Sequence, residues 1–215
     1  MRREPLSREQ VVSAALAIAD QHGVELLTMR RLGKSLGVEA MSLYNHVANK
    51  ADLIAAMLDT VVGEYRLPSP QEDWKATLRA AAASANKALL HHPWAPTLLL
   101  SFGAMPGPNW MQWSESLLAT ARRAGFSVEM AHHAFHALEG HIGGQSMRQV
   151  NFRPAPGELE GLAADFLSGV DTEQYPFLIE HIQGHLHNDY SATTSFEFGL
   201  DLILDGLERI LASGR

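Results

Sequence analysis

The sequence predicts an all-α fold, and three observations support that prediction. Helix-start signals recur along the chain, the first being Ser7 with Gln10 at the spacing of a capping box. The segment 73–91 is rich in alanine, the residue with the highest helix propensity. The final segment spaces its apolar residues alternately four and three apart, so that they share one side of a helix: Phe196, Leu200, Ile203, Leu207 and Ile210. We find no strand pattern and no internal repeat in the sequence.

The first four predicted helices cover 7–22, 28–36, 40–47 and 49–65. Thr28 and Asn49 are favoured N-cap residues, because their side-chain oxygens accept hydrogen bonds from free backbone N–H groups. Gly37 follows the second helix, where a positive φ is needed and glycine meets no steric penalty. The third helix is only about two turns long, so it depends on packing against its neighbours.

The larger remainder of the chain is also predicted to be helical, beyond a break at Pro68 and Pro70. Its predicted helices cover 73–91, 110–124, 127–150, 175–187 and 194–212. Prolines interrupt 93–108, which we expect to be irregular. Prolines and glycines also interrupt 152–175, which we expect to form a loop with a modest helix.

The stretch 28–50 is the most informative part of the chain. Its apolar residues are spaced to face inward, and these are Leu32, Leu36, Val38, Leu43 and Val47. Other side chains are left facing outward, and these are Met41, Ser42, Tyr44, Asn45, His46 and Lys50. A short helix that exposes small, hydroxyl and aromatic groups beside basic groups is typical of one that enters the major groove of DNA. An ordinary three-helix bundle would account for the buried leucines but not for this exposed rim.

Residues 6–58, LSREQVVSAALAIADQHGVELLTMRRLGKSLGVEAMSLYNHVANKADLIAAML, resemble the TetR (tetracycline-repressor) family of bacterial transcriptional regulators. The matching features follow the family's order, and they are the turn at Gly23, Leu27-Thr28, Leu36-Gly37-Val38, Leu43-Tyr44, His46-Val47 and Asn49-Lys50. The resemblance implies an N-terminal three-helix helix-turn-helix DNA-binding domain over 1–50. It implies a connecting helix over 51–66 and a larger helical ligand-binding and dimerisation domain over 67–215. It further implies a ligand-responsive repressor that binds palindromic operator DNA as a homodimer and is released by a small apolar molecule.

The resemblance also implies roles for single residues. Family positions that contact phosphates are occupied here by Tyr44 and Lys50, and a position near the DNA backbone by His46. Base edges are expected to meet Ser42 through its hydroxyl and Met41 through contact with a thymine methyl. Two further candidates complete the predicted DNA-binding set, and they are Thr28 and Arg30. Ala40 and Met41 differ from the glutamine and proline of the tetracycline repressor itself, so we expect a different operator.

Charge is distributed unevenly along the chain. The net charge is −7, but residues 1–66 hold eight basic and eight acidic residues, so the acidity lies in the remainder. The stretch 28–50 carries a local charge of +3, from four basic residues against one acidic residue, which suits salt-dependent DNA binding. The absence of cysteine excludes disulfides and thiolate metal sites. The sequence shows neither a signal peptide nor a membrane-length apolar run, so we expect a cytoplasmic protein.

The last predicted helix is expected to contribute to a dimer interface. Residues 196–211 resemble the final helix of the tetracycline-repressor type, in which two C-terminal helices from each subunit form a four-helix interface. Glycines inside helices cost about 1 kcal/mol each relative to alanine, so a packing reason is expected for them. Candidates for such close helix approach are Gly140, Gly143, Gly144, Gly199 and Gly206. The alternative is that the final helix only completes the core of a monomer.

Aromatic and methionine side chains in the larger part predict an apolar ligand pocket. The candidates are Trp94, Phe102, Met105, Trp110, Trp113, Phe135 and Phe177, with His92, His136 and Gln145 as polar groups. Ordinary core packing is the alternative for each of them. The histidine and arginine that the tetracycline repressor uses in the region matching 98–106 have no counterpart here, which argues against a metal-chelated tetracycline.

Histidine is unusually frequent beyond residue 90. Two pairs share a helix face at a spacing of four, His132 with His136 and His181 with His185, and Glu139 follows the first. Such pairs leave open a metal-binding, histidine-rich enzyme or a metal-sensing regulator. The zinc-protease pattern HExxH is absent. We therefore predict no enzyme, no catalytic residue, no cofactor and no resident metal.

Overall fold

The computed structural model describes residues 5–68, 73–101, 107–152, 158–171, 173–187 and 194–214. Within these ranges the chain is helical and contains no strand, which confirms the predicted all-α fold. The N-terminal elements are α1 (Arg8–His22), a 3-10 turn (Val24–Leu26), α2 (Met29–Leu36), α3 (Ala40–Leu43) and α4 (Lys50–Val62). The remaining elements are α5 (Trp74–His91), α6 (Ala95–Ser101), α7 (Pro108–Arg123), α8 (Val128–Asn151), α9 (Glu158–Ser168), α10 (Pro176–His187) and α11 (Ser195–Ala212).

The N-terminal helices begin and end at the predicted signals. Ser7 and Gln10 form the reciprocal hydrogen bonds of a capping box at the start of α1. Thr28 Oγ1 accepts a hydrogen bond from Arg31 N, and Asn49 Oδ1 accepts one from Asp52 N. Gly37 ends α2 in the left-handed conformation with φ 67°, where a side chain would be strained. Local chemistry therefore determines each of these boundaries.

Several predictions of helix extent differ from the structure; α4, for example, ends at Val62 and not at 65. The third helix is α-helical only over Ala40–Leu43, and the next three residues continue in tighter turns in which each N–H donates to the carbonyl three residues earlier. The proline-rich region 93–108, expected to be irregular, contains α6. Pro96 lies at the second position of that helix, where its missing N–H has no intrahelical acceptor to lose.

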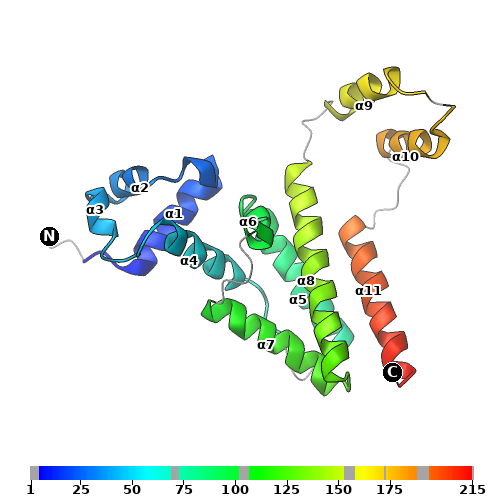
Figure 1. Cartoon of the computed structure of the whole chain (residues 1–215), viewed down its shortest axis with the longest axis horizontal. Helices are drawn as coiled ribbons and strands as arrows, with labels where there is room; N and C mark the ends of the chain where they lie inside the picture. Colours follow the sequence, from blue (N-terminus) through cyan, green and yellow to red (C-terminus); the bar gives the residue numbers. More distant parts are fainter. Residues whose placement is uncertain are drawn as a thin grey trace.

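The larger of two apolar core clusters among the described residues runs from the N-terminal helices into the larger part, and the smaller one lies among α7, α8 and α11. The larger cluster includes fully buried side chains from α1, α4, α5 and α8, for example Val11, Met57, Leu89 and Leu138. Figure 1 shows α4 leading from the N-terminal helices toward α5 and α7. α4 contacts α1 on one side and α5, α6 and α7 on the other. A displacement of α4 would therefore change the packing against helices in both parts of the molecule.

The long helices α8 and α11 lie side by side (Figure 1). The predicted apolar stripe of α11 packs largely within its own chain, since Phe196, Leu200 and Leu207 are buried there. A different set of α11 side chains faces outward, led by Phe198 at 61% exposure and Leu202 at 56%. The periodicity located the buried side of α11, whereas the resemblance had placed a subunit contact on this helix.

The helices α9 and α10 contact each other and lie beyond the ends of α8 and α11 (Figure 1). They expose several large apolar side chains, including Leu162, Phe166 and Phe177. None of the helices in the described ranges has the length and hydropathy that crossing a bilayer would require.

Candidate DNA interface and ligand cavity

The candidate DNA interface consists of α3, the turn after it and the starts of α2 and α4. Met41 is 75% exposed and Tyr44 is 45% exposed, while Leu43 between them is fully buried. Lys50 and Arg30 are exposed, and Ser42 and His46 are partly covered. The structure thus brings the predicted side chains to one end of the molecule. Thr28 is exposed there too, and its hydroxyl is used as the cap of α2.

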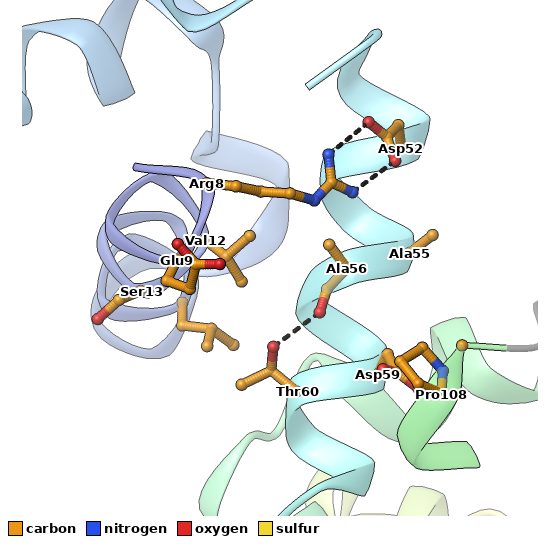
Figure 2. Close-up of a pocket in the computed structure, with 12 residues that line it drawn as sticks. Arg8, Glu9, Val12, Ser13, Asp52, Ala55, Ala56, Asp59, Thr60 and Pro108 are labelled. Atoms are coloured by element: carbon orange, nitrogen blue, oxygen red, sulfur yellow. Dashed lines mark hydrogen bonds and ion pairs between the residues drawn. The ribbon is translucent and has the colours of Figure 1, made fainter. Parts of the chain in front are cut away.

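An ion pair fixes the turn between α3 and α4. Arg8 reaches from α1 across to Asp52 in two parallel contacts of 2.8 and 3.0 Å (Figure 2). Arg8 also donates to the carbonyl oxygen of His46 at 2.7 Å, and Asp52 accepts from the backbone N–H of Ala48 at 2.8 Å. These bonds hold both ends of the turn, so the exposed segment has a defined orientation relative to α1 and α4.

The same hydrogen bonds stabilise the ionised form of Asp52. The Arg8 guanidinium, helped by the Ala48 N–H, lowers the pKa of the Asp52 carboxyl to about 2. Sequence reasoning assigned Asp52 to the first turn of α4 and gave no role to Arg8. No local signal could have joined them, because they are 44 positions apart.

A second polar contact joins α4 to α7. Asp59 of α4 accepts hydrogen bonds from the backbone N–H groups of Trp110, at 3.0 Å, and Asn109, at 3.3 Å. The Asn109 side-chain amide donates in turn to the Asp59 carbonyl oxygen at 3.0 Å. Asp59 therefore caps the start of α7 from another helix, where a carboxylate suits the helix dipole. Figure 2 shows Asp59 beside Pro108, the first residue of α7.

A cavity of about 650 Å³ lies among α4, α5, α6, α7 and α8. Four of the predicted ligand-binding residues line it, namely Trp110, Trp113, Phe135 and His136. Sequence reasoning missed other lining residues, which include Val62, Tyr65, Leu89, Leu99, Leu100 and Ile142. These are ordinary apolar residues, so nothing in the sequence separates them from the rest of the core. The lining is mainly apolar, as in most small-molecule sites.

The imidazole and carboxyl groups of the cavity lie on α8. His132, His136 and Glu139 are all at its wall, and His136 Nδ1 is 3.6 Å from a Glu139 carboxylate oxygen. Burial raises the pKa of the Glu139 carboxyl, against the opposing effect of a hydrogen bond from Trp110. The buried indole N–H of Trp113 has no hydrogen-bond acceptor among the described residues. The cavity thus offers two imidazoles and a titratable carboxyl to a mainly apolar ligand.

Several predicted ligand-binding residues lie elsewhere. His92 and Trp94 are directed away from the cavity lining because both donate toward Asp20 of α1, each at 2.7 Å. Gln145 is partly buried on α8 but is not part of the lining, and Phe177 on α10 is 82% exposed. The positions of Phe102 and Met105 fall outside the described residues. Aromatic content alone therefore selected residues outside this cavity, because it does not show which face of each helix is directed toward the cavity.

The histidine pairs differ in what they can bind. His132 and His136 have ring centroids 4.5 Å apart, but in the described chain they do not belong to any group of three metal-ligating side chains. The His185 side chain is outside the described atoms, which leaves the pair with His181 without a geometry. The described residues do contain one such group of three, formed by Glu64, His91 and His92.

Two family descriptions match this chain. Residues 11–57 match "Bacterial regulatory proteins, tetR family", and residues 67–211 match "Tetracyclin repressor-like, C-terminal domain". A transcriptional repressor, DrrR1 of Streptomyces coeruleorubidus, is 30% identical over 98% of this chain and 80% of its own length. A transcriptional regulator of Saccharopolyspora erythraea is 40% identical over 56% of this chain, and the match spans about half (51%) of that regulator.

Solved structures show the same architecture. ActR of Streptomyces coelicolor, without ligand, has a TM-score of 0.83 and 26% identity, with each chain covered over its full 100%. ActR has also been solved with actinorhodin, with a TM-score of 0.81, 27% identity and coverage of 99% and 100%. BioQ with its double-stranded DNA operator has a TM-score of 0.69 and 26% identity, covering 95% of this chain and 99% of BioQ.

Proposed function

The chain belongs to the TetR family of bacterial transcriptional regulators, which are DNA-binding proteins and not enzymes, and we propose that it is a repressor released from operator DNA by a small apolar molecule. The observation that carries this proposal is the connection through α4 between the exposed segment 40–46, called the recognition segment, and an apolar cavity. Family membership removes the alternative of a histidine-rich enzyme.

The proposed DNA contacts are made by side chains of α2, α3, the turn after α3 and the start of α4. Tyr44, Lys50 and His46 contact phosphates and set the position of the protein on the duplex. Met41 and Ser42 meet base edges in the major groove, and Arg30 reaches the DNA from α2 with Thr28 at its start. The exposure of Met41 and Tyr44 above a fully buried Leu43 supports this assignment. BioQ, solved with its operator, gives a precedent within the same architecture.

We propose that the working form is a homodimer on a palindromic operator. The outer faces of α8 and α11 support a subunit contact there, because Phe198 and Leu202 are exposed. Gly144 and Gly206 also have open space where a Cβ would stand, so a second copy could approach closely. Two recognition segments in one dimer would then enter major grooves about one helical turn, roughly 34–36 Å, apart.

The proposed effector occupies the cavity lined by Trp110, Trp113 and Phe135. ActR has been solved with actinorhodin and with (S)-DNPA, so a structure of the same architecture binds organic molecules. The mainly apolar lining, with His136 and Glu139 at the wall, favours a ligand that combines an apolar body with a hydrogen-bonding group. Glu139 favours a hydroxyl or another hydrogen-bond donor on that ligand.

The path from cavity to DNA runs through Asp59. Effector binding shifts Trp110 and Trp113 with the start of α7, and the Asp59 cap transmits that shift to α4. α4 then changes the separation of the two recognition segments. A coupling of about 1–3 kcal/mol would weaken operator binding about 5–150-fold. The proposed regulator consists of the DNA-binding domain over 1–50, the connecting helix over 51–66 and the ligand-binding and dimerisation domain over 67–215. We propose that it acts in the cytoplasm.

The test is retardation of DNA that flanks the protein's own gene. We expect retardation at low salt, a steep loss of affinity as salt rises, and release by one member of a panel of apolar compounds. A protein that retards none of this DNA at any salt concentration would contradict the proposal. Ser42→Ala provides a sharper check, because the sequences selected from a random pool should change at particular base pairs and at no others.

A further inference from the structure

We propose that Glu64, His91 and His92 form a binding site for a divalent transition-metal ion of the Zn²⁺ type, with Asp20 orienting His92 from the outside. The site lies where the ends of α4 and α5 meet α1, and none of its residues lines the apolar cavity. It is independent of the proposed effector.

The potential ligand atoms already lie close together. One atom from each of the three residues falls within 4.8 Å of the other two. The closest pair is His92 Nε2 and a Glu64 carboxylate oxygen at 3.1 Å, and the rings of His91 and His92 have centroids 4.7 Å apart. A zinc ion with bonds of about 2.0–2.2 Å requires a slight contraction of this group. Glu64 and His91 are both exposed, so their side chains can make that movement.

His92 is held in the orientation that a metal ligand needs. Its Nδ1 lies 2.7 Å from Asp20 Oδ1, and the same oxygen accepts a hydrogen bond from Trp94 Nε1 at 2.7 Å. With Nδ1–H donating to Asp20, the neutral imidazole presents the lone pair of Nε2 toward Glu64. Metal-binding histidines commonly donate their other ring N–H to a carboxylate in this way. The His92 side chain is only 4% exposed, so this orientation is fixed by packing as well.

The ligand types select the class of ion. Two imidazoles and one carboxylate suit zinc and neighbouring transition metals, whereas magnesium and calcium prefer sites made of oxygen alone. Three protein ligands leave a fourth position of a tetrahedral ion for water. Glu64 follows the end of α4, His91 ends α5, and Asp20 belongs to α1, so an ion here would tie three helices together.

A metal-free explanation exists and makes a different prediction. A doubly protonated His92 could donate to Asp20 and to Glu64 at once, forming an ordinary buried ion pair. That arrangement needs no contribution from His91. His91 is therefore the residue that separates a metal site from a simple salt bridge.

The experiment is a calorimetric titration of the chelator-treated, full-length protein with ZnCl₂. We expect one saturable site per chain. His91→Gln and Glu64→Gln should each weaken binding by at least about tenfold, and Asp20→Asn by about 10–100-fold through loss of the outer hydrogen bond. Because His91 and Glu64 are exposed, these two variants should leave the core intact, and circular dichroism checks the folding of all variants.

The matched control is His132→Gln, which removes an exposed histidine of α8 that belongs to the pair with His136. It should leave zinc affinity unchanged. The proposal is overturned if no saturable site is found, if His91→Gln binds zinc like the parent, or if the affinity depends on His132 instead. Each of these results would leave operator retardation by the metal-free protein unaffected, so the proposed repressor function is judged separately.

Discussion

The end of this molecule that carries the proposed DNA contacts (α2, α3 and the start of α4), called here the DNA-facing end, and the end that contains the cavity are stabilised in different ways. At the DNA-facing end, short helices are capped by adjacent residues, as Thr28 caps α2 and Asn49 caps α4. The cavity is enclosed by parts of five helices whose lining residues run from Val62 to Gly143. The helix boundaries of the first end are therefore set largely by nearby residues, whereas the cavity depends on how separate helices are placed. A ligand can alter the second without unfolding the first.

α4 belongs to both regions, and its polar contacts show how they are connected. At its start, Asp52 binds Arg8 and the turn after α3, and farther along, Asp59 caps α7. The two contacts connect α4 to different parts of the molecule. The first holds the recognition segment against α4, while the second ties α4 to the wall of the cavity. Substitutions at these contacts can therefore test separately the stability of the recognition segment and the connection between α4 and the cavity.

The largest expected effect is the loss of packing at the DNA-facing end. Leu43 is fully buried, so Leu43→Ala should lower the free energy of unfolding by about 2–5 kcal/mol, measured by urea denaturation. Met41→Ala, two residues away and 75% exposed, is the control and should leave the unfolding midpoint nearly unchanged. Equal destabilisation by both variants would mean that Leu43 does not anchor the recognition segment.

The division between the two regions also explains what the sequence could predict. Caps act within a few residues, so Thr28, Gly37 and Asn49 marked their helix ends correctly. The termination of α3 at Leu43 depends on the following turn, which is fixed by Arg8 from another helix. A contact over such a sequence distance leaves no periodic signal.

The cavity was predicted only in part for a related reason. Trp110, Trp113 and Phe135 were identified because aromatic residues are conspicuous, but the same rule also selected Trp94. The Trp94 indole donates to Asp20, a partner that sequence spacing cannot reveal. The apolar residues that complete the lining resemble any other core residues. Helix placement, which is a tertiary property, decides which of them reach the cavity.

The second prediction tests the connection between the regions. Asp59→Ala should lower the free energy of unfolding by about 0.5–2 kcal/mol through loss of the α7 cap. It should also abolish most of the 5–150-fold effect of the ligand on operator affinity, which is about 1–3 kcal/mol of coupling. Asp73→Ala is the matched control, because Asp73 caps α5 with the same chemistry and has its bond to Ala76 N at 2.9 Å. A control variant that loses the ligand response as fully as Asp59→Ala would remove Asp59 from the path.

Gly107 offers a second way to disturb the same connection. A Cβ added at Gly107 would collide with the Asp59 carboxylate. Gly107→Ala should therefore displace Asp59 from the start of α7 while keeping the carboxylate itself. We expect a weakened ligand response, measured as operator affinity with and without effector. A normal response in this variant would show that the cap can be displaced without loss of coupling.

A smaller effect is expected from a single phosphate contact. Lys50→Ala should weaken binding to all DNA sequences similarly and reduce the slope of log affinity against log salt by about one per site. Lys75→Ala is the control, since Lys75 lies on α5 and pairs with Asp205 and Glu208 at 2.8 and 2.6 Å. An unchanged slope for Lys50→Ala would exclude Lys50 from the phosphate contacts.

The smallest expected effect concerns the ion pair that orients the recognition segment. The pKa of Asp52 falls from 3.8 to about 2 in the folded chain, so the pair stabilises the fold above pH 4 and this contribution is lost as the pH falls toward 2. Arg8→Gln should lower the free energy of unfolding by roughly 0.5–1 kcal/mol at neutral pH, a modest value because both side chains are partly solvated. Urea denaturation between pH 6 and pH 3 should show the difference between parent and variant shrinking below pH 4. If the difference stays constant with pH, Arg8 acts through its hydrogen bond to the His46 carbonyl and not through the charge of Asp52.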